Sequence, residues 1–253
     1  MTDLAVAFTV SGQREEYLQK SLESWLRVRG VQDAYMLFCV EPWARFPILD
    51  FRDWAAKHFT YSEVLQNGET YGCLKNTREA FGRSFERGAS FAIVAEEDIE
   101  VAPDILEYFR WAQKEYQDEQ DVTMVCAHAK DALDVTRAAV VRMPWFNPLV
   151  SGTWRDRWDL FVRPQWKGFS AGEWDRDNQA WDTNLRELIR TSGRSSIFPA
   201  RSRSMHIGEL STWMPPMLAA HIYDSSRSDC FVGDCPPQSY YEVPWTDIPG
   251  LLV

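Results

Sequence analysis

The sequence lacks the long apolar segment that a membrane-spanning helix requires. No stretch approaches about 18 apolar residues, and the opening MTDLAVAFTVSGQ has neither the basic region nor the apolar run of a signal peptide. Cysteine is also sparse, with five residues, and the stretch between Cys230 and Cys235 contains no further cysteine or histidine to complete a zinc site. We therefore expect a soluble, cytoplasmic protein with reduced thiols.

Basic charge is likewise limited, because the 253 residues carry a formal net charge of −10. This charge argues against non-specific nucleic-acid binding as the main activity, although residues 132–210 are locally basic and permit contact with phosphates. The composition is 45% hydrophobic and 14% aromatic, which is typical of a globular chain. Without repeats or low-complexity linkers, we expect one domain over 1–253, with halves at 1–131 and 132–253.

Strand and helix patterns alternate through the first half. Short apolar runs predict strands, and apolar residues at helical spacing predict helices between them. The expected strands are 4–10, 34–40, 90–95 and 122–128, and the expected helices are 14–30, 77–88 and 103–116. This order predicts an α/β fold with a mostly parallel sheet between helices, in which ligands bind beyond the carboxyl ends of the strands.

The second half is rich in tryptophan and less periodic. Half of the 12 tryptophans lie within 145–181, among glycine, proline, arginine and aspartate. A helix is predicted over 180–193, and a strand followed by a loop over 196–211. The last forty or so residues show little periodicity, and we expect them to form a lid or packed tail.

Three consecutive acids, Glu96, Glu97 and Asp98, follow the strand predicted over 90–95. Adjacent carboxylates repel one another unless a divalent cation or a set of donors neutralises them, and hard oxygen ligands suit Mg²⁺ or Mn²⁺. Alternation along a strand predicts Glu96 and Asp98 on one face and Glu97 on the other. The alternative interpretation is an acidic turn that favours the N-terminus of the next helix.

The segment EEDIEVAPDILEYF resembles the metal-binding segment of the N-acetylglucosaminyltransferase I family, and weaker likeness extends to about residue 211. Members of that family are inverting glycosyltransferases of the Rossmann-like GT-A fold that use UDP-GlcNAc and Mn²⁺. The resemblance implies that Asp98 binds the metal and that Glu96 contacts the nucleotide. It also implies that Glu97, where the family normally has Asp, touches the ribose or the donor sugar.

Three further segments resemble the nucleotide side of the family. FTVSGQR implies that Arg14 engages the nucleotide, and FCVEP implies that Glu41 meets the uracil, where the family has Asp. GCLKNTREAF implies weaker roles for Lys75 and Asn76 in the same pocket. For Arg14 and Glu41 the alternative is a charged residue on a surface loop.

The donor-sugar and acceptor side is carried by two other segments. QAWDTNLRELIR resembles the family's Trp-Asp segment, which implies that Asp182 is the general base and that Trp181 packs beside the sugar. Asp182 also fits a helix N-cap. NPLVSGTW resembles the stretch that holds the donor sugar, through Gly152 and Trp154, although each tryptophan also fits core packing.

The segment RSRSMHIGELS resembles the loop that closes over the donor. It implies diphosphate contacts for Arg201 and Arg203 and a phosphate contact for Ser211. His206 is a candidate second metal ligand, although the family itself lacks this histidine, and a histidine satisfied within a strand is the alternative.

Together these residues predict a metal-dependent, inverting glycosyltransferase with a UDP-linked donor. The chain starts at its first strand, so we expect a bacterial or phage enzyme rather than one of N-glycan maturation, acting on a glycan, a protein or a hydroxylated DNA base. Two alternatives stay open. One is a non-catalytic nucleotide-sugar-binding protein, and the other is a metal-dependent nucleotidyltransferase, which needs a glycine-rich phosphate loop that the sequence does not convincingly show.

Overall fold

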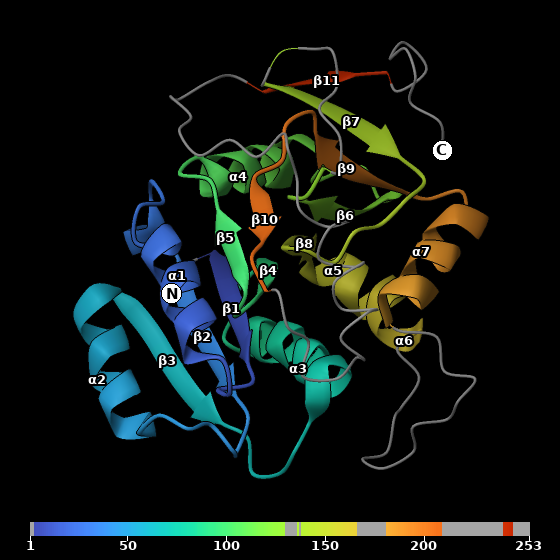
Figure 1. The fold of residues 1–253 in the computed structure, drawn as a ribbon. Helices are drawn as coiled ribbons and strands as arrows, with labels where there is room; N and C mark the ends of the chain where they lie inside the picture. Colours follow the sequence, from blue (N-terminus) through green and yellow to red (C-terminus); the bar gives the residue numbers. More distant parts are fainter. Residues whose placement is uncertain (1–2, 130–135, 137, 166–180, 209–239, 245–253) are drawn as a thin grey trace.

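The computed structural model describes residues 3–129, 136, 138–165, 181–208 and 240–244. Among them, nine strands form one central sheet in the order β11-β7-β9-β6-β8-β4-β1-β2-β3, and helices cover both of its faces (Figure 1). The strands are β1 (Leu4–Val10), β2 (Tyr35–Val40), β3 (Tyr61–Gln66), β4 (Phe91–Glu96), β6 (Val122–Cys126), β7 (Ala139–Met143), β8 (Ser151–Trp154), β9 (Ser195–Pro199) and β11 (Tyr241–Val243).

The sheet is mostly parallel, as predicted. β3, β2, β1 and β4 pair in parallel, and β6 pairs in parallel with β9. β8 lies between β4 and β6 and runs antiparallel to both, and β7 runs antiparallel to β9. The carboxyl ends of β2, β1, β4 and β6 therefore meet at one edge of the sheet.

Two hydrophobic cores form because successive side chains of a strand point to opposite faces. On β1, Val6 and Phe8 belong to one core and Ala7 to the other. The first core lies under α1 (Glu15–Trp25), α2 (Ile48–His58) and α4 (Ile105–Glu115). The second lies under α3 (Gly72–Glu86), η2 (Trp158–Val162) and α7 (Trp181–Thr191). The remaining helical elements of the described chain are the short turns η1 (Val31–Asp33), α5 (Arg155–Arg157) and α6 (Arg163–Gln165).

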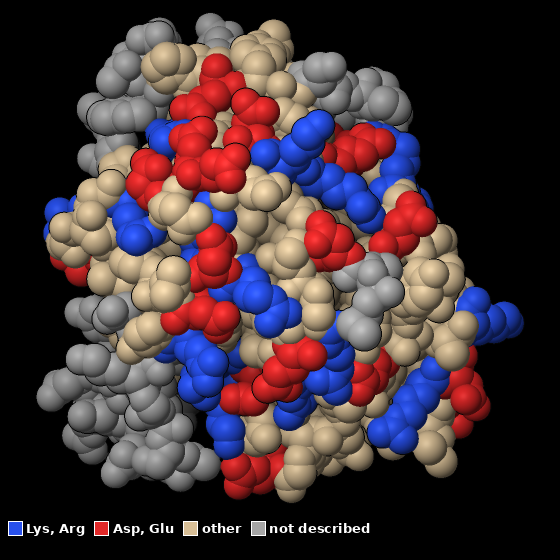
Figure 2. All heavy atoms as spheres, turned by 180° about the vertical axis from the view of Figure 1, so that it is seen from behind, with Lys and Arg blue, Asp and Glu red and all other residues tan. Residues whose placement is uncertain are grey.

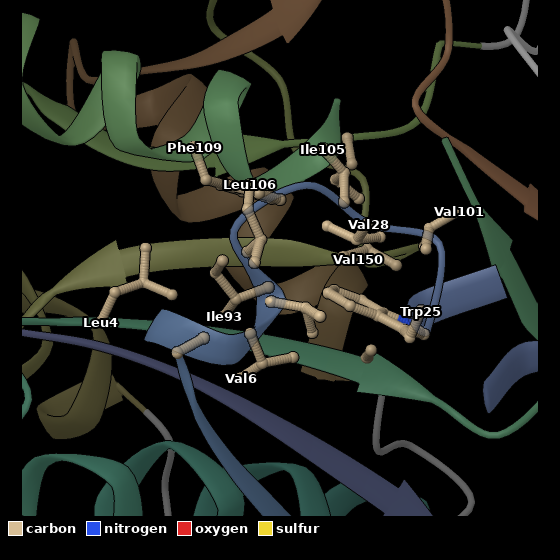
Figure 3. Packing of buried hydrophobic residues seen from close by; sticks show 14 of the residues in the cluster. Leu4, Val6, Trp25, Val28, Ile93, Val101, Ile105, Leu106, Phe109 and Val150 are labelled. Atoms are coloured by element: carbon tan, nitrogen blue, oxygen red, sulfur yellow. The ribbon is translucent and has the colours of Figure 1, made fainter. Parts of the chain in front are cut away.

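The first core is continuous from the sheet to α4 and the end of α1. Figure 3 shows its side chains meeting from strands and helices that are far apart in the sequence, among them Val6, Ile93, Trp25, Ile105 and Phe109. All five side chains are fully buried. Burial of this kind contributes about 1.5–3 kcal/mol per large apolar side chain, so the core fixes the sheet edge at which β1 and β4 end.

A small antiparallel ribbon extends from the carboxyl end of β4. It consists of β5 (Ile99–Val101) and β10 (Ser204–His206), with His206 opposite Ile99 (Figure 1). The N–H of Ile207 donates to the carbonyl of Asp98 at 2.9 Å and continues the pairing by one residue. The ribbon thus brings β10 next to the acidic triplet.

The patterns missed α2 and β3, which lie between the predicted second strand (34–40) and the predicted second helix (77–88). Of the residues in α2, Ala55 is fully buried and the others are partly or well exposed, so its apolar stripe is weak. β3 is an edge strand in which Val64 is the buried residue. Elements that bury one face so lightly leave little hydrophobic periodicity to detect.

Gly152 and Trp154 do not form the donor-sugar loop that the resemblance implied, and this expectation is corrected. Both belong to β8, where Gly152 pairs with Ile93 and Trp154 pairs with Phe91. Because β8 runs antiparallel to β4, Trp154 lies at the end of β4 that is far from Glu96. The Trp154 ring is buried edge-on against Phe91, and its Nε1–H donates to the carbonyl of Gln113 at 3.0 Å.

The surface carries charges of both signs. Figure 2 shows the face opposite to that of Figure 1, where acidic and basic side chains are interspersed over the described part. No broad basic field covers the described part of this face, in keeping with the acidic composition. In the described chain, no helix combines the length and the apolar character needed to cross a bilayer.

We predict that Gly152→Ala destabilises the fold. A Cβ at this position lies 2.6 Å and 2.8 Å from two atoms of the Phe91 ring and 3.2 Å from the carbonyl oxygen of Ala92. Overpacking of a core costs about 1–3 kcal/mol, and urea unfolding measures it as a lower free energy of unfolding.

Gly82→Ala is the matched control, since Gly82 lies within α3 and its Cβ meets nothing within 4 Å. Helix propensity predicts that this variant gains up to about 1 kcal/mol. A Gly152→Ala variant as stable as the unsubstituted chain contradicts the packing described for β8.

Candidate functional site

The acidic triplet lies at the carboxyl end of β4, beside the loop that follows β1. Glu96 is the last residue of β4 and is opposite Thr9 of β1. Glu97 is buried and accepts hydrogen bonds from the N–H groups of Ser11 (2.9 Å) and Gly12 (3.1 Å), and from the Ser11 hydroxyl. Glu97 therefore fixes the position of the β1–α1 loop through these hydrogen bonds.

Gly12 is required at its position in this loop. Its φ is +70°, in the left-handed region that favours glycine, and a Cβ there would lie 2.4 Å from the Cβ of Ala44. The loop consequently passes close to the segment after β2, and it delivers Arg14 to the carboxylates.

Arg14 bridges two acids of the triplet. Its Nε donates to Glu97 Oε1 at 3.0 Å, and its Nη1 donates to Asp98 Oδ2 at 2.7 Å. The expected alternation, with Glu97 on the face opposite Glu96 and Asp98, is wrong, because the strand ends at Glu96 and the chain turns. Glu97 and Asp98 both reach the same guanidinium.

Asp98 is the residue on which two cationic groups converge. Its Oδ2 accepts from Arg14 and lies 3.2 Å from His206 Nε2. Burial alone raises the pKa of Asp98, but the hydrogen bond from His206 and the charge of Arg14 outweigh it and hold that pKa below its usual value. Asp98 is therefore a carboxylate in the folded protein, with the imidazole of His206 beside it.

The pKa of Glu96 is shifted in the opposite direction to that of Asp98. Burial, and then the negative charge of Asp98, raise the pKa of Glu96 to about 7, and the charge of Asp182 acts in the same direction. The thiol of Cys73, at the start of α3, lies 3.8 Å from Glu96 Oε1. The structure thus brings the amino ends of α3 and α7 to the same site as the triplet.

Asp182 and Trp181 share the first turn of α7 but face different surroundings. Asp182 is partly exposed, and its Oδ2 lies 3.7 Å from Arg186 Nη2. Trp181 packs in the second core, with its ring centroid 5.4 Å from that of Phe146. Asp182 is available to a ligand, whereas Trp181 supports the helix that presents it.

Glu41 and Asn76 lie at the carboxyl end of β2. Glu41 accepts a hydrogen bond from the N–H of Tyr71 at 3.0 Å, and its pKa is raised, chiefly by burial. Asn76 is buried, donates to the carbonyl of Cys39 at 3.0 Å and accepts from Asn67 at 3.1 Å. Asn76 therefore ties α3 to the ends of β2 and β3, and Glu41 borders the site.

Arg203 lies elsewhere than the resemblance implied. Its guanidinium is fully buried, and its Nε lies 2.9 Å from Asp104 Oδ2, which also accepts from the Tyr240 hydroxyl at 2.6 Å. Arg203 also donates to the carbonyl of Arg201. The structure thus corrects the expectation of a diphosphate contact from Arg203, because its guanidinium is buried and pairs with Asp104. Ser211 lies outside the described residues.

The site fits a divalent cation that is coordinated partly by protein side chains and partly by a bound ligand. Asp98 Oδ1 is buried and has no hydrogen-bond partner within the described chain, and His206 adds an imidazole nitrogen beside Oδ2. Carboxylate oxygen suits Mn²⁺ and Mg²⁺, and imidazole nitrogen is a common metal ligand in proteins. In the described residues no three His, Cys, Asp or Glu side chains converge as a complete cage. Phosphate and water oxygens are suitable further ligands for such an ion.

Two features of the site carried no usable signal in the sequence. Gly208 approaches Asp98 so closely that a Cβ there would lie 2.5 Å from Oδ2. Cys73 reaches Glu96 from another helix. The segments that contain Gly208 and Cys73 resemble parts of the family's binding site. The contacts of these two residues with Asp98 and Glu96 depend on the fold and could not be predicted from those segments.

Comparison with known proteins gives a matching family and several solved structures of similar fold. A model of the GNT-I family matches residues 66–222. Similar solved structures include GalNAc-T7 with UDP, GalNAc and Mn²⁺, at a TM-score of 0.56 and 14% identity over 85% of this chain and 45% of that one. TarS residues 1–349 of S. aureus gives a TM-score of 0.54 and 12% identity over 81% of this chain and 60% of that one.

A third structure is the mannosyltransferase PcManGT of Pyrobaculum calidifontis in complex with GDP-Man and Mn²⁺, with a TM-score of 0.52 and 15% identity over 77% of this chain and 54% of that one. At such identities the likeness shows the fold alone. The chain spans between 45% and 60% of the length of these three structures. A search of curated proteins gives no match.

We predict that Glu96 lowers the free energy of unfolding of the metal-free protein as the pH rises from about 4.5 to about 7, by up to ~1.4 kcal/mol per pH unit. Burial lowers the pKa of His128 to about 4, so His128 contributes an opposite slope, and the Glu96 contribution is measured as a difference from a variant that lacks this carboxyl. In this window the unfolded chain has released the Glu96 proton, whereas the folded protein retains it because the pKa is raised to about 7. His206 acts in the same direction at higher pH: although burial opposes it, Asp98 raises the pKa of His206, and that stability is lost as the imidazolium deprotonates.

Urea unfolding in the presence of a chelator, repeated across this pH range, measures the slope. Glu96→Gln removes the titrating carboxyl, so the free energy of unfolding of the unsubstituted chain minus that of the variant should fall as the pH rises across the window. A difference that stays constant or rises with pH contradicts the electrostatic description of Glu96.

Proposed function

The chain belongs to the GNT-I family and is a glycosyltransferase, and we propose that it transfers a sugar from a UDP-linked donor to a hydroxyl group with inversion at the anomeric carbon. The observation that carries this proposal is the Asp98–His206 pair, at the carboxyl end of β4, where an α/β sheet binds its ligand. GalNAc-T7 and PcManGT, which share the fold, have each been solved with Mn²⁺ and a nucleotide or nucleotide sugar.

Asp98 and His206 would hold Mn²⁺ or Mg²⁺. An ion held there would supply positive charge against the negative charge that develops on the diphosphate as the bond to the sugar breaks. Arg14 contributes a fixed positive charge to the same place, since it already lies 2.7 Å from Asp98. The buried Glu97 keeps that guanidinium in position through its own hydrogen bond.

We assign nucleotide binding to the ends of the first strands. Glu41, at the end of β2, is suited to accept a hydrogen bond from the uracil ring, and Glu96 faces the region between the metal ligands and α7. In the metal-free protein the pKa of Glu96 is raised to about 7, and a divalent cation at Asp98 would lower it, which leaves a carboxylate able to accept a hydrogen bond from a ligand hydroxyl.

We assign the role of general base to Asp182. It is partly exposed at the first turn of α7 and close enough to Glu96 to influence its pKa. Asp182 accepts the proton of the acceptor hydroxyl as that oxygen attacks the anomeric carbon and UDP leaves on the opposite side. A single displacement of this kind inverts the configuration.

The acceptor class follows from charge. The net charge of −10 favours a glycan or a protein over the DNA backbone. Glycans and proteins present hydroxyl groups without a dense array of phosphates. We therefore propose a glycan or protein acceptor rather than a hydroxylated DNA base.

Slow hydrolysis of UDP-sugars, followed as UDP release with Mn²⁺ or with chelator, tests the proposal. We expect release only with metal. Asp98→Ala should abolish both release and metal-dependent UDP binding, because it removes the carboxylate ligand. Asp182→Asn should lower release by about 10²-fold or more while UDP binding, measured by calorimetry, stays within about threefold.

Asp118→Asn, an exposed change at the end of α4, is the control and should behave as the unsubstituted chain. Release of pyrophosphate instead of UDP identifies a nucleotidyltransferase. Tight UDP binding without turnover of any nucleotide sugar identifies a non-catalytic binding protein. Either result excludes the proposed reaction.

A further inference from the structure

A groove of about 580 Å³ runs between α1 and α2, on the outside of the first core. Its floor is apolar and consists of Leu18, Leu22 and Leu26 from α1 together with Phe46, Phe51 and Trp54 from α2 and the residues before it. Leu18 and Leu22 are buried core residues, and the other four pack against that core while remaining partly exposed. The groove thus leaves part of the first core accessible from outside.

The rim of the groove is acidic. Glu15, Glu23 and Asp50 line it together with Gln19 and Pro47, and none of its lining residues is basic. All three carboxylates are exposed, so they create a negative field along the groove rather than internal ion pairs. Only Glu23 has a partner within the rim, the amide of Gln19 at 2.9 Å.

The shape of the floor favours a side-chain-bearing helix over a sugar or a base. The Trp54 ring stacks with Phe51 (centroids 5.9 Å apart, 7° between planes) and with His58 (4.6 Å, 25°). These neighbours lie one turn before and one turn after Trp54 on α2, so its ring faces are engaged within the helix. Ring edges and leucine methyl groups are left for a ligand, and they suit apolar side chains.

The length of the groove matches a short helix. α1 contributes residues from Glu15 to Leu26, and a helix of 11 residues such as α1 is about 16 Å long. An amphipathic helix lays apolar side chains at i, i+3 or i+4 and i+7 into such a groove. Charged residues on either side of that stripe would face the rim.

We propose that the α1–α2 groove is a docking site for a basic amphipathic helix of a partner protein. Lysine or arginine on both sides of the apolar stripe complements Glu15, Glu23 and Asp50. A second copy of this chain is disfavoured as the occupant, because the chain carries a net charge of −10 and the rim is acidic. The proposal is independent of the donor chemistry at Asp98.

A fluorescent peptide of roughly 15 residues, helical, with leucine at the stripe positions and lysine beside them, is the probe. A second peptide carries glutamate in place of each lysine. Anisotropy titrations should give a Kd in the micromolar range for the lysine peptide, at least about tenfold weaker binding for the glutamate peptide, and weaker binding of the lysine peptide as salt is added.

The chain offers a matched pair of triple variants. Glu15→Gln, Glu23→Gln and Asp50→Asn together should weaken binding of the lysine peptide by about tenfold. Glu86→Gln, Glu115→Gln and Asp118→Asn remove the same charge from exposed positions that do not line the groove, and should leave the Kd within about twofold.

Leu26→Asn tests the floor and should also weaken binding about tenfold or more; its thermal midpoint shows whether it has folded. Absence of binding below about 100 μM, equal affinity for the two peptides, or equal losses in the two triple variants would overturn the proposal. The first outcome excludes a helix site, and the second shows that the acidic rim does not select a basic helix. The third attributes the preference for the lysine peptide to the overall charge of the protein.

Discussion

Mutual repulsion of the carboxylates at the carboxyl end of β4 is the constraint around which the site is arranged. Glu97 is neutralised by the β1–α1 loop and by Arg14, and Asp98 by Arg14 and His206. Glu96 has the least compensation, and its pKa rises accordingly. Backbone also lies against these side chains, since the N–H of Gly12 donates to Glu97 and Gly208 approaches Asp98 closely. A divalent cation at Asp98 would relieve the same repulsion.

Much of the nucleotide half was predictable from the sequence. β1, β2, β4 and β6 are continuous apolar runs, and α1, α3 and α4 carry clear helical stripes, so their order implied a parallel sheet with a ligand edge. The position of the triplet at that edge followed directly from its place after β4. The helix that carries Asp182 was also foreseen, because WDTNLRELIRT is amphipathic, and α7 begins at Trp181, one residue before Asp182.

Other features depend on pairing between distant segments. β8 inserts antiparallel between β4 and β6, which places Gly152 and Trp154 in the core, and no local pattern specifies that insertion. Arg203 is buried because Asp104 and Tyr240, each far away in the sequence, form its charged and aromatic surroundings. A buried arginine and a phosphate-binding arginine look alike in a sequence, since the difference lies in their partners.

The central claim is that Asp98 and His206 hold a divalent cation at the carboxyl end of β4. Anomalous scattering at the manganese absorption edge, from crystals grown with MnCl₂ and UDP, tests it most directly. The account predicts one strong peak within coordination distance of an Asp98 carboxylate oxygen and His206 Nε2, with the diphosphate oxygens completing its ligands. A manganese peak and UDP density away from this pair would contradict it.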